Sequence, residues 1–156
     1  MIVFDIQPRL RAGRLELGTR REMTRAIMAS MKFALTRTSD RMDYYDESSI
    51  QLDFFDDHCL HFIGFAYSPH FAVEYRSVDP FDLDAKGLFR LINEEEKEPV
   101  PFNDYDPLFS TQIIAFWDAQ QQYDYKGGHR RTVFATFSMG DQRYLDEMLA
   151  IKKGGR

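Results

Sequence analysis

The residues most able to do chemistry lie in one short run, where His58, Cys59 and His61 directly follow Asp56 and Asp57. Imidazole, thiolate and carboxylate groups are common zinc ligands, and a cysteine beside a histidine can act as an activated nucleophile. On a strand, however, Cys59 and His61 would point to one face and His58 to the other. The rest of the sequence holds no second ligand pair at zinc-site spacing. We therefore expect no metal ion and no cofactor, and we expect Cys59 to be a small buried apolar residue.

Phosphate and nucleic-acid binding have little support in the sequence. Gly127 and Gly128 precede a basic run at 129–131, but the glycine spacing and the Lys-Ser/Thr pair of a phosphate loop are missing, so we predict a turn. Aromatic rings can stack on bases, yet those of the expected strands alternate as core residues do: Phe54, Phe62, Phe116 and Phe134.

The charges are unevenly distributed along the chain. The net charge is -5, but residues 39–118 carry eighteen acidic and five basic side chains, whereas the segments 1–38 and 119–156 are both net basic. An acidic middle repels phosphate backbones, so we expect no nucleic-acid partner. It is either a solvated face or an acidic surface that docks a basic protein.

Hydrophobic periodicity predicts two main helices. The first is expected to begin at Thr19, because Thr19 and Glu22 have the spacing of a capping box. The second follows Asp84, a suitable capping residue, and ends before Pro99. The apolar stripe of the first helix comprises Met23, Ala26, Ile27, Ser30 and Met31, and that of the second Leu88, Leu91 and Ile92.

Alternating apolar residues predict strands over 50–55, 59–67 and 71–75, which would form an antiparallel meander, and over 112–117 and 132–137. A further strand is expected near 33–36, and a short helix over 144–149 closes the chain. The fold class is therefore α+β. We expect an antiparallel sheet of about five to seven strands with two main helices on one face.

We expect residues 1–156 to form a single domain. The stretches Ser48–Asp56 and Ser110–Asp118 resemble each other, and each follows a capped helix. This likeness indicates a tandem helix-plus-strand repeat with halves 13–78 and 79–138.

Cysteine usage and hydropathy indicate the compartment. A single cysteine cannot form an internal disulfide, which favours a reducing compartment, and we expect a cytoplasmic protein. The basic N-terminal stretch is not followed by the apolar region of a signal peptide. The longest apolar run, residues 60–67, is far too short to cross a membrane.

The run Gly13–Met23, in which a Gly-x-Leu-x-Leu-Gly stretch leads into a capped helix, resembles the opening of a class of small bacterial proteins. These proteins are similar to tandem helix-plus-hairpin repeats of the β-lactamase-inhibitor-protein type, and related chains are encoded beside polymorphic toxins as immunity proteins. The continuation in this sequence is 43–45, 50–57, 60–65 and 79–91. The resemblance implies a toxin inhibitor and carries over no catalytic residues.

We therefore predict a non-catalytic, cytoplasmic immunity protein that binds a basic toxin, such as a nuclease, through an acidic surface. Carboxylates would steer the toxin and exposed aromatic rings would anchor it, unless those rings pack under the second helix. The alternative is a small metal-assisted hydrolase that uses Asp56, His58 and His61. The residues expected to bind the partner are Tyr44, Tyr45, Asp53, Phe55, Asp56, Asp57, Glu94, Glu95, Glu96 and Trp117.

Overall fold

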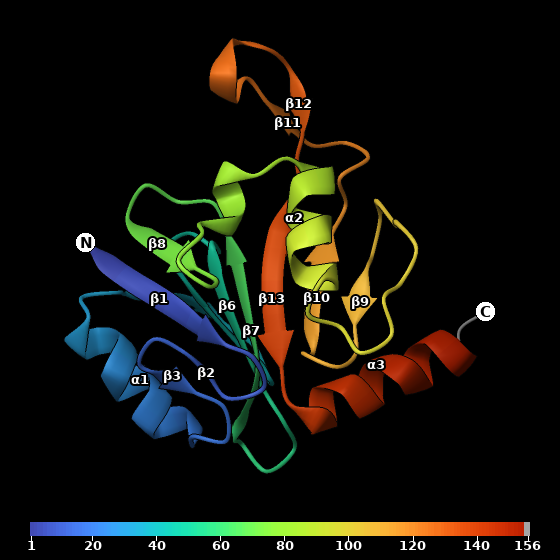
Figure 1. Ribbon diagram of the computed structural model, residues 1–156. Helices are drawn as coiled ribbons and strands as arrows, with labels where there is room; N and C mark the ends of the chain where they lie inside the picture. The colour runs from blue at the N-terminus through green and yellow to red at the C-terminus, as the bar shows by residue number, and fades with distance from the viewer. Residues whose placement is uncertain (155–156) are drawn as a thin grey trace.

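The fold is built on a seven-stranded antiparallel sheet (Figure 1). The computed structural model describes residues 1–154. The strands of the sheet, in spatial order, are β4 (Leu35–Thr38), β5 (Met42–Tyr45), β6 (Ile50–Phe54), β7 (Leu60–Ala66), β13 (Thr136–Gly140), β10 (Ile114–Trp117) and β9 (Leu108–Phe109).

Side chains alternate between the two faces of this sheet, as the sequence predicts. In β6, Ile50, Leu52 and Phe54 are buried, whereas Gln51 and Asp53 between them are only half-buried. One face of the sheet therefore belongs to the hydrophobic core, and the other is more open to solvent.

A layer of two helices and a small sheet covers the core face (Figure 1). The helices are α1 (Arg21–Ser30) and α2 (Ala85–Asn93), whose Met28 and Ile92 are fully buried in one core cluster. Between them lies a sheet of order β3-β2-β1-β8, in which the Phe4 ring of β1 lies 5.0 Å from the Phe65 ring of β7. Its strands are β1 (Ile2–Gln7), β2 (Arg11–Ala12), β3 (Leu15–Glu16) and β8 (Phe71–Glu74).

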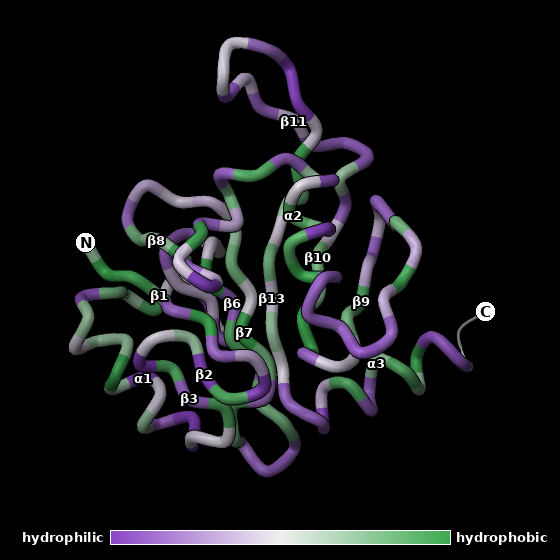
Figure 2. Tube along the Cα trace, in the orientation of Figure 1, coloured by the Kyte–Doolittle hydropathy of each residue, from purple (hydrophilic) through white to green (hydrophobic). Residues whose placement is uncertain are grey.

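The molecule is thus α+β, with α1 and α2 on one face of the main sheet and a C-terminal helix, α3 (Gln142–Gly154). In Figure 2 the hydrophobic segments gather in the main sheet and in the layer that faces it. The strands of the main sheet form two groups: β4 to β7 follow α1 in the chain, and β9, β10 and β13 follow α2. The last strand of the first group, β7, pairs with the last strand of the second, β13, at the centre of the sheet. The similar stretches 48–56 and 110–118 fall on β6 and β10, each the outer neighbour of a central strand.

The two predicted helix caps have different outcomes. Asp84 caps α2 as expected, because its side chain accepts a hydrogen bond from the Gly87 amide. The cap at Thr19 is wrong: α1 begins at Arg21, and no side chain caps it. The Thr19 carbonyl instead accepts a hydrogen bond from the Leu60 amide, which ties the segment to β7 in an extended form.

The predicted three-stranded meander is also wrong in its last strand. β8 leaves the main sheet and pairs in parallel with β1, with Ile2 opposite Phe71. The β1 strand alternates Phe4 and Ile6 as buried residues, but its partner lies about seventy residues along the chain, as the register shows. A local pattern cannot reveal such a pairing.

A two-stranded hairpin, β11 (Tyr123–Asp124) and β12 (Arg131–Thr132), projects beyond the main sheet (Figure 1). We call residues 123–132 the arm. Its tip contains the short helix η2 (Lys126–Gly128), and Gly127 and Gly128 have φ values of 84° and 87°, which confirms the predicted turn. A second short helix, η1 (Pro80–Asp82), precedes α2. Within residues 1–154, no helix is both long and apolar enough to cross a membrane.

Candidate functional site

The side of the main sheet that faces away from α1 and α2 is the candidate functional site, and we call it the open face. Strand register places one residue of each strand in a single row across this face. Their sequence neighbours point into the core, so these side chains point outward. The row is Arg37, Tyr44, Gln51, Gly64, Ser138, Ala115 and Leu108; the rows on either side add Asp53, Phe62, Ala66, Thr136 and Trp117.

The centre of the open face is hollow because its residues are small. Gly64, Ser138 and Ala115 lie side by side on three adjacent strands. A Cβ atom on Gly64 would lie 3.0 Å from the Phe62 ring, so the glycine makes room for that ring on the sheet. Two adjacent hollows, of about 40 and 200 Å³, share Phe62, Thr136 and Ser138 in their walls.

Two aromatic pairs border the hollow. At one end the Phe62 ring lies 4.8 Å from the ring of Tyr144, which reaches over from α3. Burial raises the pKa of Tyr144 to about 12, so its hydroxyl is neutral at physiological pH. On the other side the Trp117 ring lies 4.7 Å from Tyr105, and Trp117 is 47% exposed. The open face therefore combines a shallow centre with aromatic edges.

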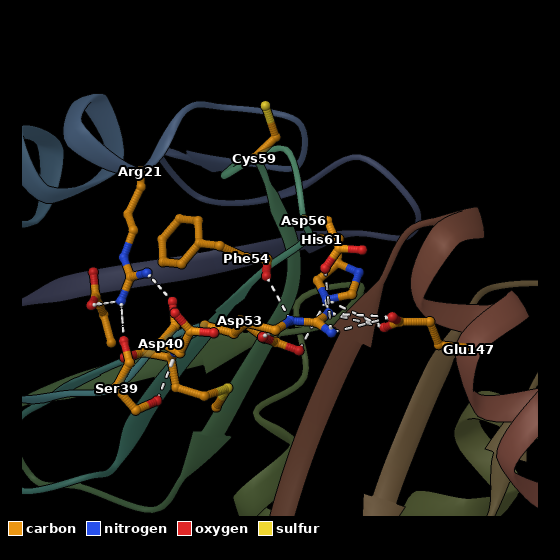
Figure 3. Close-up of polar contacts among 12 residues, drawn as sticks. Arg21, Ser39, Asp40, Asp53, Phe54, Asp56, Cys59, His61 and Glu147 are labelled. Carbon is orange, nitrogen blue, oxygen red and sulfur yellow. Dashed lines mark hydrogen bonds and ion pairs between the residues drawn. The ribbon is translucent and has the colours of Figure 1, made fainter.

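A polar cluster around Arg41 attaches α3 to the open face (Figure 3). The Arg41 guanidinium lies 3.1 Å from the Glu147 carboxylate of α3 and 3.6 Å from that of Asp53, and its Nε donates to the Phe54 carbonyl. His61 is fully buried, and its Nε2 lies 2.9 Å from Asp53 Oδ2. Figure 3 shows Asp53, His61 and Glu147 pointing toward one another. The Arg41 guanidinium, shared by the Asp53 and Glu147 carboxylates, thus joins a helix to the sheet.

The residues of the hydrolase alternative are only partly brought together. Asp56 and His61 both lie beside the Arg41 guanidinium, at 4.0 and 3.2 Å, but among the described contacts His58 does not join them. His61 is buried in the Arg41 cluster, whereas His58 and Asp56 are exposed in the turn between β6 and β7. In the part of the chain that the structure describes, no group of three His, Cys, Asp or Glu side chains could hold a metal ion. Cys59 is half-buried rather than buried, and it points away from the cluster in Figure 3.

A serine, a histidine and an aspartate also meet at the turn between β5 and β6, but not in the order of a catalytic triad. His70 Nδ1 lies 2.7 Å from Asp46 Oδ1, and the Ser68 hydroxyl donates to the same carboxylate instead of to the imidazole. Ser49 also donates to Asp46. Asp46 and the next two residues all have positive φ, between 51° and 72°, so these hydrogen bonds hold a strained turn.

The structure divides the predicted partner-binding residues. Tyr44 and Trp117 lie on the open face, where the Arg37 guanidinium covers the Tyr44 ring at 4.0 Å. Asp53 lies there too, but it is paired with Arg41. Tyr45 was wrongly predicted as exposed: it is 2% exposed and lies opposite Ile50 on the core face.

The carboxylates next to β6 are only partly free. Asp57 pairs with Arg143 of α3 at 2.7 Å, and the same guanidinium lies over the Phe55 ring at 4.9 Å. The Asp56 side chain is 81% exposed and lies at the limit of an ion pair with Arg41. Two arginines therefore neutralise only part of the acidic surface expected around Asp53. Arg41 is shared by Asp53, Asp56 and Glu147, and Arg143 is shared by Asp57 and Asp141.

The acidic run after α2 lies on the covered side of the sheet. Glu94 is exposed, and Glu95 pairs with Arg76 at 2.6 Å. Glu96 was wrongly predicted as a contact residue, because it is buried and its carboxylate accepts hydrogen bonds from the backbone amides of Thr111 and Gln112. It holds the turn that leads into β10.

One carboxylate on the core face, that of Asp43, stabilises the fold and is not available to a partner. Asp43 is fully buried and lies between the guanidinium groups of Arg21 and Arg25 of α1, at 2.7 and 2.8 Å. Burial by itself would raise the pKa of Asp43, but hydrogen bonds from Arg25, Arg21 and Thr38 outweigh it and lower the pKa to about 2. Asp43 therefore stays ionised and fastens α1 to the sheet.

Phe62 was wrongly predicted as a core residue, because its ring lies on the open face. Sequence reasoning missed the other residues that shape this face, namely Gly64, Ser138, Ala115 and Tyr144. The small residues of β7, β10 and β13 occupy the outward positions between buried neighbours. This alternation of small and large apolar residues is the one sequence pattern from which the open face could have been predicted. Comparisons of the chain with protein-family models, with curated proteins and with solved structures found no match.

Proposed function

We propose that the protein is a non-catalytic immunity protein that binds a protein toxin across its open face and neutralises it. The observation that carries the proposal is the hollow at the centre of that face, which lies between the Phe62–Tyr144 pair and the Trp117–Tyr105 pair. The resemblance of the N-terminal run to small bacterial immunity proteins supports the same class.

The open face has the features of a protein-binding surface. Interfaces obtain most of their binding energy from a few aromatic or arginine side chains surrounded by contacts that exclude water. Trp117 is well exposed, and Tyr44 with its covering Arg37 lies across the hollow from it. Between them, the Phe62 ring lies over Gly64, and Ala115 has only a methyl group to keep a partner away from the sheet.

The net charge of the whole molecule should contribute more to toxin binding than any single ion pair. The net charge of -5 attracts a basic partner over long range and raises the association rate at low salt. Asp53 and Asp57 are matched by arginines within the chain, so they add little in the bound state. The proposed partner is a basic toxin such as a nuclease, acting in the cytoplasm.

The test is protection of growth in a bacterial host that expresses a candidate basic toxin together with this protein. We expect the wild-type chain to protect, and Ala115→Arg, which fills the hollow, to lose protection. Trp117→Ala should weaken the toxin complex by more than tenfold, because a central aromatic anchor contributes 2 kcal/mol or more, roughly, in protein interfaces.

The matched control is Met23→Ala, which removes a large exposed side chain from α1 on the covered side. It should protect as well as the wild type. Circular dichroism must first show that all three variants are folded. If Ala115→Arg and Trp117→Ala protect fully, the toxin does not bind at the open face.

A further inference from the structure

A cavity lies beneath the arm, away from the centre of the open face. Its volume is about 420 Å³, within the range of small-molecule sites. The arm, η1, the first turns of α2 and the chain that enters β13 enclose it. The lining residues are Tyr67, Pro80, Phe81, Leu83, Leu88, Gln122, Tyr123, Asp124, Lys126, Val133, Phe134, Ala135 and Thr136.

Aromatic rings from four different segments contribute to the walls of this cavity. Tyr67 follows β7, Phe81 belongs to η1, Tyr123 to the arm, and Phe134 precedes β13. The Tyr67 and Phe81 rings meet edge to face, with their centroids 6.3 Å apart. Tyr67 and Tyr123 are 67% and 51% exposed, an unusual exposure for two aromatic residues that border one cavity. Apolar planar surface is therefore available to a ligand on several sides.

Both charged residues of the lining are already paired within the protein. Lys126 forms an ion pair with Asp82 of η1. Asp124 accepts two hydrogen bonds from Arg131, at 2.6 and 3.1 Å, and Arg131 also donates to the Asp82 carbonyl. These contacts hold the arm over the cavity and pair both charged residues of its lining. The Arg130 guanidinium is not a lining residue, but it lies 4.4 Å over the Tyr123 ring.

The polar groups that are left for a ligand are neutral. In the described residues, the Gln122 amide and the Thr136 hydroxyl make no side-chain hydrogen bond, and neither do the hydroxyls of Tyr67 and Tyr123. Each can donate to or accept from a bound molecule. A charged ligand would lose its hydration here without gaining a free counter-ion, whereas a neutral one would not incur that cost.

We infer that the cavity beneath the arm is a binding site for a neutral, planar aromatic molecule that carries hydroxyl or carbonyl groups. The rings of Tyr67, Phe81, Tyr123 and Phe134 contact its flat faces and edges, and the neutral amide and hydroxyl groups bind its polar substituents. The paired charges of the arm exclude ionised molecules of similar shape. This site is separate from the toxin-binding function proposed above.

The test uses 2-naphthol as the probe, titrated into the full-length protein and followed by NMR of the backbone amides. We expect saturable shifts at cavity residues such as Leu88, Val133 and Ala135, none of which lines the hollows of the open face. The anion 2-naphthoate has the same ring system, and it should bind at least tenfold more weakly, because the one cationic residue of the lining described above, Lys126, is already paired with Asp82. Saturated decahydro-2-naphthol should also bind more weakly, because it is not planar.

Two tyrosines of the arm provide a matched pair of variants. Tyr123 lines the cavity, whereas Tyr125 is 64% exposed and does not. Tyr123→Ala should weaken 2-naphthol binding at least fivefold. Tyr125→Ala should weaken it less, because the Tyr125 ring packs edge to face on Tyr123 but does not line the cavity. Ala135→Phe should abolish binding by filling the cavity, once circular dichroism shows that the variant is folded.

Several results would overturn the inference. These are the absence of saturable shifts in the wild-type protein, shifts confined to the open face around Gly64 and Ser138, equal binding of 2-naphthoate, or equal losses in Tyr123→Ala and Tyr125→Ala. Because 2-naphthol is tested alone, failure here leaves the toxin-binding proposal unaffected, and failure of growth protection leaves this site unaffected.

Discussion

The two faces of the seven-stranded sheet use the same strands for opposite purposes. On the core face, large side chains such as Ile63, Phe65 and Phe137 are almost fully buried under the helical layer. On the open face, the residues between them are small or neutralised, as Gly64 and Asp53 are. Stability therefore depends on one face, and the other is free to vary in shape with little effect on folding.

The most direct way to break this comparison is to change two neighbouring residues of β13 that point to opposite faces. Phe137→Ala on the core face should lower the free energy of unfolding by about 4 kcal/mol, because it leaves a large cavity. Thr136→Ala on the open face should change it by less than about 0.5 kcal/mol. Urea denaturation of both variants measures the difference. Similar losses in the free energy of unfolding would mean that the side chains of the open face are packed as tightly as those of the core face.

The same contrast applies to the two buried ion clusters. Asp43→Asn should cost about 3 kcal/mol, because Arg21 would lose its partner in a largely buried site. Asp53→Asn should cost about 1 kcal/mol, since Arg41 keeps Glu147 and more solvent. Thermal and urea unfolding of each variant give the comparison. If Asp53→Asn lost more stability than Asp43→Asn, the Asp53 cluster on the open face would contribute more to stability than the Asp43 cluster, which would contradict the comparison.

The pH dependence of stability sharpens the role of Asp43. Its pKa in the folded protein, about 2, is below the ordinary value of 3.8. The stabilisation is therefore fully present above pH 3.8 and is lost as the pH falls toward 2. Over that window the wild type should lose about 2 kcal/mol more than Asp43→Asn, since each unit of pKa corresponds to about 1.4 kcal/mol. Parallel curves for the two proteins would contradict the assignment.

The smallest expected effect concerns Gly64 on the open face. Gly64→Ala places a methyl group against the Phe62 ring, which can rotate toward the hollow. We expect a loss of less than about 1 kcal/mol, together with shifted NMR signals for Phe62 and its neighbour Tyr144. A loss above 2 kcal/mol would show that this ring is held as rigidly as the core.

The elements that could be predicted are those defined by local signals. The alternation of Ile50, Leu52 and Phe54 identified β6, and Asp84 identified the start of α2. The small residues of the open face also alternate with large apolar ones in the sequence. Residues such as Gly64 and Ser138, however, have no functional group that would identify them as part of a binding site. Their meaning depends on which strands lie side by side.

The errors share a physical cause, which is that long-range contacts determine burial. Glu96 lies in an acidic run that is typical of a solvated surface, yet the backbone of Thr111 and Gln112 satisfies its carboxylate in the interior. Thr19 has the correct spacing for a cap, but its carbonyl is used by Leu60 of β7. In both cases the competing partner lies at least fifteen residues away, beyond the range of capping and charge patterns.

The position of β7 and β13 at the centre of the sheet has a consequence during synthesis of the chain. β7 ends at Ala66, and the strand that covers its second edge begins only at Thr136. While the ribosome makes the segment in between, a long and mostly apolar strand presents a row of unpaired amide and carbonyl groups. We expect nascent chains that end before β13 to associate through this edge. Synthesis of β13 is therefore the step that prevents self-association, because β13 covers the edge.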